Sequence, residues 1–94
     1  MYYFDIGSST IKLYEYKNEL TLIEEKSIMF KKGFSEEGIQ DENIEKMMEF
    51  IQEVKDEYNL NKNNTEIYAT GIWRKIPNEQ LANIKTRFNE LELK

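Results

Sequence analysis

The chain has 94 residues, of which 39% are hydrophobic and 13% aromatic, so it can bury one small core and is not expected to be disordered. It contains no cysteine and no histidine, which excludes disulfides, thiol chemistry and the commonest general base at neutral pH. A net charge of −5 disfavours nucleic acid and anionic membranes as partners, because neither is attracted to a surplus of carboxylates.

The first residues lack the pattern of an export signal. Asp5 follows Met1–Phe4 at once, without a basic segment or a long apolar stretch. The apolar runs elsewhere stay far below the roughly 20 residues that a membrane span needs. We therefore expect a cytoplasmic protein with no membrane partner.

The first third of the sequence predicts a meander of three strands. Residues 2–6 and 10–16 are rich in strand formers and are separated by a turn cluster at Gly7–Ser9. A third strand is expected from about residue 20 to residue 30. Its polar middle, Glu24–Lys26, favours an edge strand that is partly in water.

The remainder alternates helix and strand. Apolar residues recur at three- and four-residue steps between 44 and 58, which predicts an amphipathic helix with Asp41 or Asn43 as its cap. A short strand is expected at 66–70, and a second helix after Pro77, capped by Asn78.

The order of elements is therefore β-β-β-α-β-α, and residues 91–94 could begin a further strand. This order predicts an α/β fold in which helices cover a mixed sheet and the strand at 66–70 joins the first strand in parallel. The side chains expected in the core are Met47, Ile51, Val54 and Phe88.

The segment Asp5–Lys12 (DIGSSTIK) is the first candidate for chemistry. A glycine lets the backbone approach a ligand, and the hydroxyls and amides that follow it can converge on phosphate oxygens. A carboxylate at the end of a strand could hold a hydrated divalent metal beside that phosphate. The pattern is short, so an ordinary polar turn accounts for it equally well.

This segment resembles the first phosphate-binding loop of the sugar kinase/Hsp70/actin superfamily, whose ribonuclease-H-like sheet has the same order of elements. A second stretch, Tyr68–Asn78 (YATGIWRKIPN), resembles the A-T-S-A-x-R-x-A-x-N motif of the exopolyphosphatase and guanosine pentaphosphate phosphatase (Ppx/GppA) family. Residues 32–39 resemble that family's lead-in to its first long helix. The resemblance implies that residues 1–94 form one domain, the N-terminal part of an actin-like ATPase or Ppx/GppA domain, with the final strand truncated.

The resemblance also implies roles for individual residues. Asp5 would assist a magnesium ion, and the implied phosphate-binding residues are Gly7, Ser8, Ser9, Thr10, Lys12 and Arg74. The family's general-base glutamate would lie beyond Lys94, so no catalytic residue is expected within this chain and no activity from it alone. The implied substrates are polyphosphate or a phosphorylated nucleotide such as guanosine pentaphosphate, cleaved at a phosphoanhydride bond.

Three positions depart from the family pattern. Ser9 stands where the family usually has asparagine, Lys12 where it has arginine, and Gly71 where it has serine. Ser9 and Lys12 are common in kinases and activators of the wider superfamily, so half of a sugar kinase/Hsp70/actin-type ATPase is one alternative. Another is a non-catalytic interaction module that forms a homo-oligomer through the unpaired sheet edge beside residues 67–69.

Overall fold

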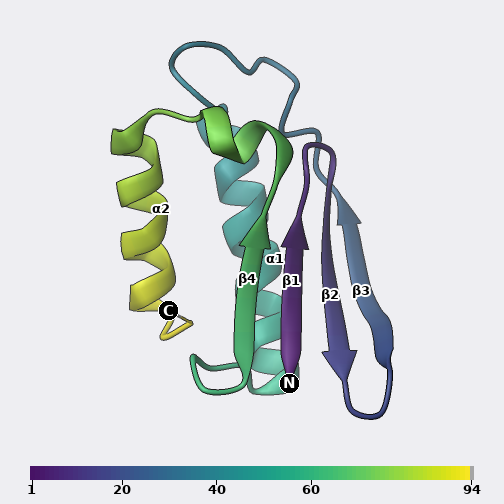
Figure 1. Cartoon of the computed structure of the whole chain (residues 1–94). Coiled ribbons are helices and arrows are strands. Elements are labelled where there is room, and N and C mark those ends of the chain that lie inside the picture. Colours follow the sequence, from purple (N-terminus) through teal and green to yellow (C-terminus); the bar gives the residue numbers. More distant parts are fainter. Residues whose placement is uncertain (94) are drawn as a thin grey trace.

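The computed structural model describes residues 1–93, which form a four-stranded sheet, two α-helices and one 3₁₀-helix (Figure 1). In chain order the elements are β1 (Tyr2–Ile6), β2 (Thr10–Tyr16), β3 (Leu20–Ser27), α1 (Asp41–Tyr58), β4 (Thr65–Ala69), η1 (Gly71–Lys75) and α2 (Asn78–Glu90). The strand order in the sheet is β3-β2-β1-β4. β1 is antiparallel to β2 and parallel to β4, which confirms the predicted α/β class and the parallel junction.

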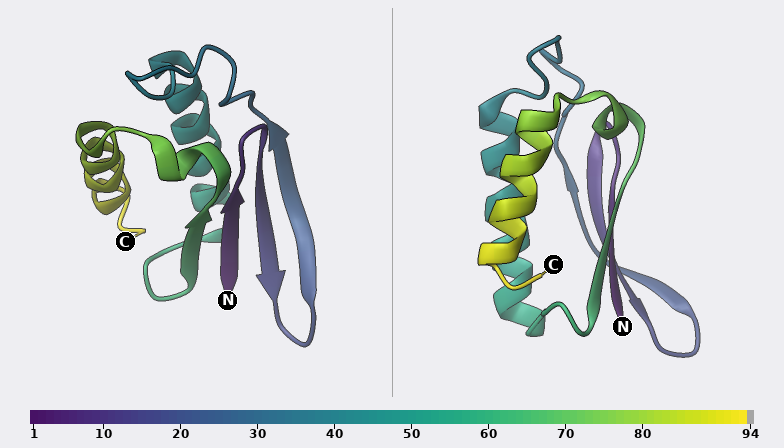
Figure 2. Two further views of the ribbon diagram at one scale, coloured as in Figure 1. Left: turned by 45° about the horizontal axis from the view of Figure 1, so that its top comes forward. Right: turned by 60° about the vertical axis from the view of Figure 1, so that its left-hand side comes forward.

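Both helices lie on the same face of the sheet, as the right-hand view of Figure 2 shows. Because successive side chains of a strand point to opposite faces, Phe4 and Ile6 of β1 face the helices while Tyr3 and Asp5 lie on the other side. The prediction that helices cover the sheet therefore holds for one face. We call the other the open face.

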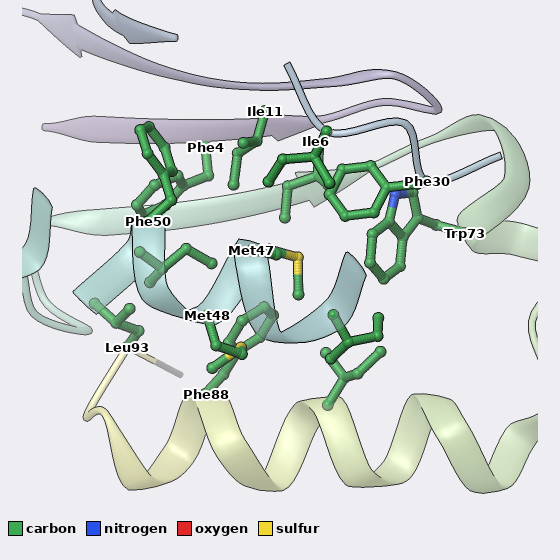
Figure 3. Close-up of a cluster of buried hydrophobic side chains, with 14 of the residues drawn as sticks. Phe4, Ile6, Ile11, Phe30, Met47, Met48, Phe50, Trp73, Phe88 and Leu93 are labelled. Carbon is green, nitrogen blue, oxygen red and sulfur yellow. The ribbon is translucent and has the colours of Figure 1, made fainter. Parts of the chain in front are cut away.

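The core lies between the sheet and the two helices (Figure 3). Met47 and Ile51 of α1 are fully buried, and Val54 and Phe88 keep at most 6% of their surface exposed. Burying side chains of this size contributes roughly 1.5–3 kcal/mol each. The predicted core is confirmed.

The polar middle of β3 lies at the edge of the sheet, as predicted. Glu24 and Glu25 point to opposite faces: Glu24 accepts a hydrogen bond from the Tyr58 hydroxyl of α1 at 3.0 Å, whereas Glu25 pairs with Lys12 at 3.7 Å on the open face. β3 ends at Ser27, earlier than predicted, because the next residues turn inward and bury Phe30.

The predicted caps of α1 are wrong. Gln40 is the N-cap and makes no side-chain cap bond, while Asp41 is already helical. Asn43 is buried, and its side-chain amide donates to the carbonyl of Met29 at 3.1 Å. The asparagine therefore ties the loop after β3 to the helix instead of capping it. The helix ends at Tyr58, where the apolar steps end, and its C-cap Asn59 takes a left-handed conformation with φ 55°.

The predicted cap of α2 is wrong as well, because Pro77 is the N-cap and Asn78 the first helical residue. Gln80 of this helix exchanges two hydrogen bonds with the backbone of Ile39, at 3.0 and 2.7 Å. Residues 91–93 form a turn in which Leu93 is buried, so no strand begins there, and Lys94 lies outside the described residues. Neither helix within residues 1–93 is long and apolar enough to cross a membrane.

Candidate anion-binding site

Three segments far apart in the sequence meet beyond the carboxyl ends of β1 and β4. They are the β1–β2 connection at Gly7–Ser9, the loop that follows β3 at residues 28–31, and η1. Figure 1 shows η1 packed beside the top of β1. We call the first of these segments the Gly7–Ser9 turn. The motif residues from the start of the chain and those from residue 71 onward thus share one site.

Every backbone carbonyl from Gly7 to Thr10 accepts a hydrogen bond, three of them from other segments and that of Thr10 from Gly7 within the hairpin. The bonds run from Trp73 Nε1 to Gly7 O at 2.9 Å, from Lys31 N to Ser8 O at 3.1 Å, from Ile28 N to Ser9 O at 3.2 Å, and from Gly7 N to Thr10 O at 2.9 Å. The negative ends of these peptide dipoles are therefore occupied by donors from the protein itself.

The N–H groups of Ser8 and Ser9, in contrast, donate to no acceptor within residues 1–93. Both residues are half-buried, at a turn that projects beyond the sheet. A backbone N–H that is left without a protein partner must find water or a ligand. Successive free amides of this kind form a small concavity that favours anions. The turn therefore presents free N–H donors, while its carbonyl acceptors are already bonded.

The Ser8 hydroxyl provides a further hydrogen-bond donor at the turn. Its oxygen accepts a hydrogen bond from the backbone N–H of Ile72 at 3.4 Å, which leaves its single proton free to donate. Gly71 permits this approach: its φ is +66°, and a Cβ at this position would lie 2.5 Å from Ser8 Oγ. A glycine at position 71 thus has a physical reason in this chain.

The remaining predicted site residues lie around the turn. Asp5 and Lys12 are register partners on the open face, where Lys12 is paired with Glu25 rather than with Asp5. Thr10 begins β2 directly after the turn, and Arg74 is exposed on η1, next to the residue that bonds Gly7. The structure brings η1 to the turn and places Asp5 and Lys12 on the strands below it.

The described residues contain no cluster of three or more metal-binding side chains. Asp5 is exposed, three residues before Ser8, and makes no ion pair with residues 1–93. Magnesium in phosphate sites commonly keeps several waters and takes only one or two carboxylates besides the phosphate oxygens. Asp5 fits this limited role and could not hold a metal ion alone.

Sequence reasoning missed the contribution of the loop after β3 and of the Trp73 indole. A five-residue 3₁₀-helix such as η1 is too short to show a periodic pattern. The backbone donors of Ile28 and Lys31 carry no residue-type signal at all. The one available signal was composition, since Trp73 is the only tryptophan and is adjacent to the motif arginine.

The mixed four-stranded sheet with two helices is of the α/β class and is consistent with a fragment of an actin-like, ribonuclease-H-like fold. Among solved structures, the chain resembles crystal structures of the Ppx/GppA family from Aquifex aeolicus. The family member described in a structural characterisation of the family has a TM-score of 0.68 and 19% identity over 97% of this chain. The type II variant of the Ppx/GppA phosphatase has a TM-score of 0.60 and 21% identity over 92% of this chain. The Ppx/GppA enzyme has a TM-score of 0.62 and 21% identity over 89% of this chain.

The chain spans about a third of those structures, 31%, 32% and 31% of their lengths respectively. No family model and no curated protein matches the sequence. At this level of identity the likeness establishes the fold, which is that of the N-terminal part of the Ppx/GppA structures.

Proposed function

We propose that this chain provides the N-terminal phosphate-binding wall of a cytoplasmic phosphohydrolase related to the Ppx/GppA enzymes. The observation that carries the proposal is the Gly7–Ser9 turn, whose carbonyls are all occupied while the amides of Ser8 and Ser9 are free. The likeness to structures described as Ppx/GppA phosphatases supports the reaction class. The substrate would be a phosphoanhydride, in polyphosphate or in guanosine pentaphosphate.

In this proposal each motif residue has a task. The amides of the turn and the hydroxyls of Ser8, Ser9 and Thr10 hold phosphate oxygens, and Gly7 allows the close approach. Arg74 offers a planar fork suited to a phosphate chain. Lys12 would exchange its carboxylate partner for phosphate, which costs little because its ion pair with Glu25 is long, at 3.7 Å, and partly exposed.

Magnesium, when bound beside Asp5, would neutralise phosphate charge that develops during cleavage. The carboxylate of Asp5 would hold one side of the hydrated ion. Hydrolysis also needs a base to orient water and a second wall to exclude bulk solvent. In this proposal both are supplied from outside this chain, so the 94-residue chain by itself should bind phosphate and not turn it over.

Calorimetric titration of the pure chain tests the proposal. Inorganic tripolyphosphate should bind saturably at one site and more tightly than orthophosphate, because it spans both the turn and Arg74. Arg74→Ala should weaken binding, whereas Lys85→Ala, which removes an exposed lysine from α2, should not. Absence of saturable binding by the wild type, or equal effects of the two variants, would contradict the proposal.

Two further measurements on the same sample separate the alternatives. Tighter binding of magnesium-ATP than of tripolyphosphate would favour a kinase or ATPase of the wider superfamily. Metal-dependent phosphate release by the pure chain would refute the statement that it needs a second wall. A chain that binds no phosphate compound would leave the interaction-module alternative.

One observation favours that alternative independently. The open face carries a shallow depression of about 550 Å³, lined mainly by tyrosines. Tyr16, Leu20, Leu22 and Tyr68 expose between 46% and 55% of their surface there. β4 is an edge strand within the described sheet. Such surfaces invite association, including a homo-oligomer through β4. A monomer at high concentration in sedimentation equilibrium would count against it.

A further inference from the structure

The bond between Trp73 and Gly7 differs from the others that hold the turn. The donors to the carbonyls of Ser8, Ser9 and Thr10 are backbone N–H groups, whereas the donor to Gly7 O is the indole Nε1 of Trp73. It is the one bond of the four that depends on the identity of a side chain. The indole nitrogen has a single hydrogen and can only donate, so it can hold a carbonyl and nothing else.

This bond changes how the hairpin closes. In a tight two-residue hairpin the residues that flank the loop exchange two backbone bonds. Here Gly7 N donates to Thr10 O at 2.9 Å, but within residues 1–93 the return bond from Thr10 N to Gly7 O is not formed. The Gly7 carbonyl is turned toward the indole instead. Trp73 thus takes away an acceptor that would otherwise lie on the hairpin.

The core fixes the direction of the indole. Trp73 is 6% exposed, and its ring meets Phe30 edge-on, with centroids 5.0 Å apart and planes inclined at 68°. Phe30 is fully buried, and Figure 3 shows the two rings together at one end of the core. An edge-on aromatic pair of this kind has a defined geometry. The donor is therefore held in place before any ligand arrives.

We infer that Trp73 is a positioning residue for the anion site, acting through Gly7 rather than on the ligand. The inference rests on the proposed function. By holding the Gly7 carbonyl, the indole keeps a negative dipole away from the ligand and keeps the amides of Ser8 and Ser9 free. The same contact fixes η1, and hence the backbone of Arg74, against the turn. Anion binding and the indole bond should strengthen each other, since coupling between two sites is reciprocal.

The test compares Trp73→Phe with Phe30→Leu in calorimetric titrations with inorganic tripolyphosphate. Trp73→Phe keeps an aromatic ring but deletes the donor, and should weaken binding about tenfold, as expected for one lost hydrogen bond in a preorganised site. Phe30→Leu loosens the same aromatic pair and keeps the donor, so it should lower the thermal midpoint while affinity changes much less. Circular dichroism establishes that each variant is folded.

A second readout uses the wild-type protein alone. The proton resonance of the Trp73 indole N–H should shift in step with saturation by tripolyphosphate, although the indole does not contact the ligand. Equal affinity of Trp73→Phe and wild type overturns the inference and leaves the proposed function standing. An equal loss of affinity in Phe30→Leu also overturns it, because Trp73 would then act only through stability. A wild type that does not bind overturns the proposed function, and the inference with it.

Discussion

The meander contains two short connections between neighbouring strands, and they are built differently. The Gly7–Ser9 turn is half-buried and receives hydrogen bonds from η1 and from the loop after β3. The second connection, Lys17–Glu19, is exposed throughout. It has one backbone bond of its own, from Lys17 N to Glu19 O at 3.4 Å, and a long surface ion pair between Lys17 and Glu15 at 3.9 Å.

Both connections reverse the chain between antiparallel strands. The single backbone hydrogen bond and the long ion pair of the second connection are therefore enough to close a hairpin. The additional bonds of the Gly7–Ser9 turn must serve another purpose. Three of them end on backbone carbonyl oxygens and one, from Ile72 N, ends on the Ser8 hydroxyl oxygen, so the amides of Ser8 and Ser9 stay available. The first turn therefore presents free N–H donors, while the second only connects two strands.

The largest expected effect comes from removing the support beneath the first turn. Phe30→Ala should destabilise the protein by about 3–5 kcal/mol, because it leaves a cavity beside the Trp73 ring at a fully buried position. Urea unfolding monitored by circular dichroism measures this. Leu22→Ala, at an exposed position of β3, is the control and should change stability by less than about 0.5 kcal/mol. Similar losses of unfolding free energy in Phe30→Ala and Leu22→Ala would mean that Phe30 does not support the turn.

A smaller effect is expected from blocking the approach of η1. Gly71→Ala places a Cβ 2.5 Å from Ser8 Oγ and on a backbone with φ +66°, so the Ser8 hydroxyl must rotate away from Ile72 N or the turn and η1 must move apart. The expected cost is about 1–3 kcal/mol. Thermal unfolding provides the measurement, with Asn18→Ala in the second connection as the matched variant. If neither substitution changes the thermal midpoint, the close approach of Gly71 to Ser8 does not affect stability.

A still smaller loss of stability is expected when the Ser8 hydroxyl is removed. Ser8→Ala leaves the N–H of Ile72 without its acceptor and should cost about 1 kcal/mol of stability. Ser9→Ala is the matched variant, since the Ser9 side chain makes no hydrogen bond with residues 1–93. Chemical denaturation should separate the two. Equal stability of both variants would show that the bond from Ile72 contributes nothing.

The smallest expected effect is on stability in acid, and it comes from an ion pair outside both turns. Arg87 donates two hydrogen bonds to the Glu45 carboxylate, which lowers the pKa of Glu45 from its usual 4.5. A lowered pKa in the folded state stabilises the protein above the unfolded pKa, and this contribution is lost as the pH falls through the folded value. Because the pair is exposed, the contribution is small.

Glu45→Gln should therefore unfold at lower urea than wild type near neutral pH, and the difference should shrink between about pH 5 and about pH 2. Glu49→Gln, on the same helix, is the control. Tripolyphosphate binding near neutral pH should be the same in both variants, because neither residue lies near the turn. A difference in unfolding that persists unchanged in acid would exclude the ion pair as its cause.

Much of the fold could be predicted from the sequence because its signals are local and periodic. Strand formers at 2–6 and 10–16 indicated two strands with the bounds that the structure has, and the apolar steps of 44–58 indicated a helix that begins three residues earlier, at Asp41. The helix caps could not be predicted, since Asn43 is used for a bond to the Met29 carbonyl 14 positions away, a contact that exists only after folding. Residue preference at a cap is overridden by such tertiary contacts.

The residues of the candidate turn could be named from the sequence, whereas the hydrogen bonds that shape the turn could not. Glycine and hydroxyl side chains in sequence indicated a phosphate-binding turn at Gly7–Thr10, and the arrangement of this turn is compatible with that reading. Which groups face the ligand depends on donors from η1 and from the loop after β3, including backbone N–H groups of Ile28 and Lys31. No pattern of residue types encodes those, so only the folded structure shows that the carbonyls are occupied.

An amide-resolved NMR titration of the wild-type chain with inorganic tripolyphosphate would show whether the Gly7–Ser9 turn binds anions. We expect saturable shifts of the Ser8 and Ser9 amides, with smaller shifts along η1, and none at Lys17–Glu19. Added sodium chloride should weaken the binding without moving the shifts to other residues. Equal shifts in the two connections, or shifts that follow exposed lysines wherever they lie, would contradict the claim that the Gly7–Ser9 turn is a built anion site.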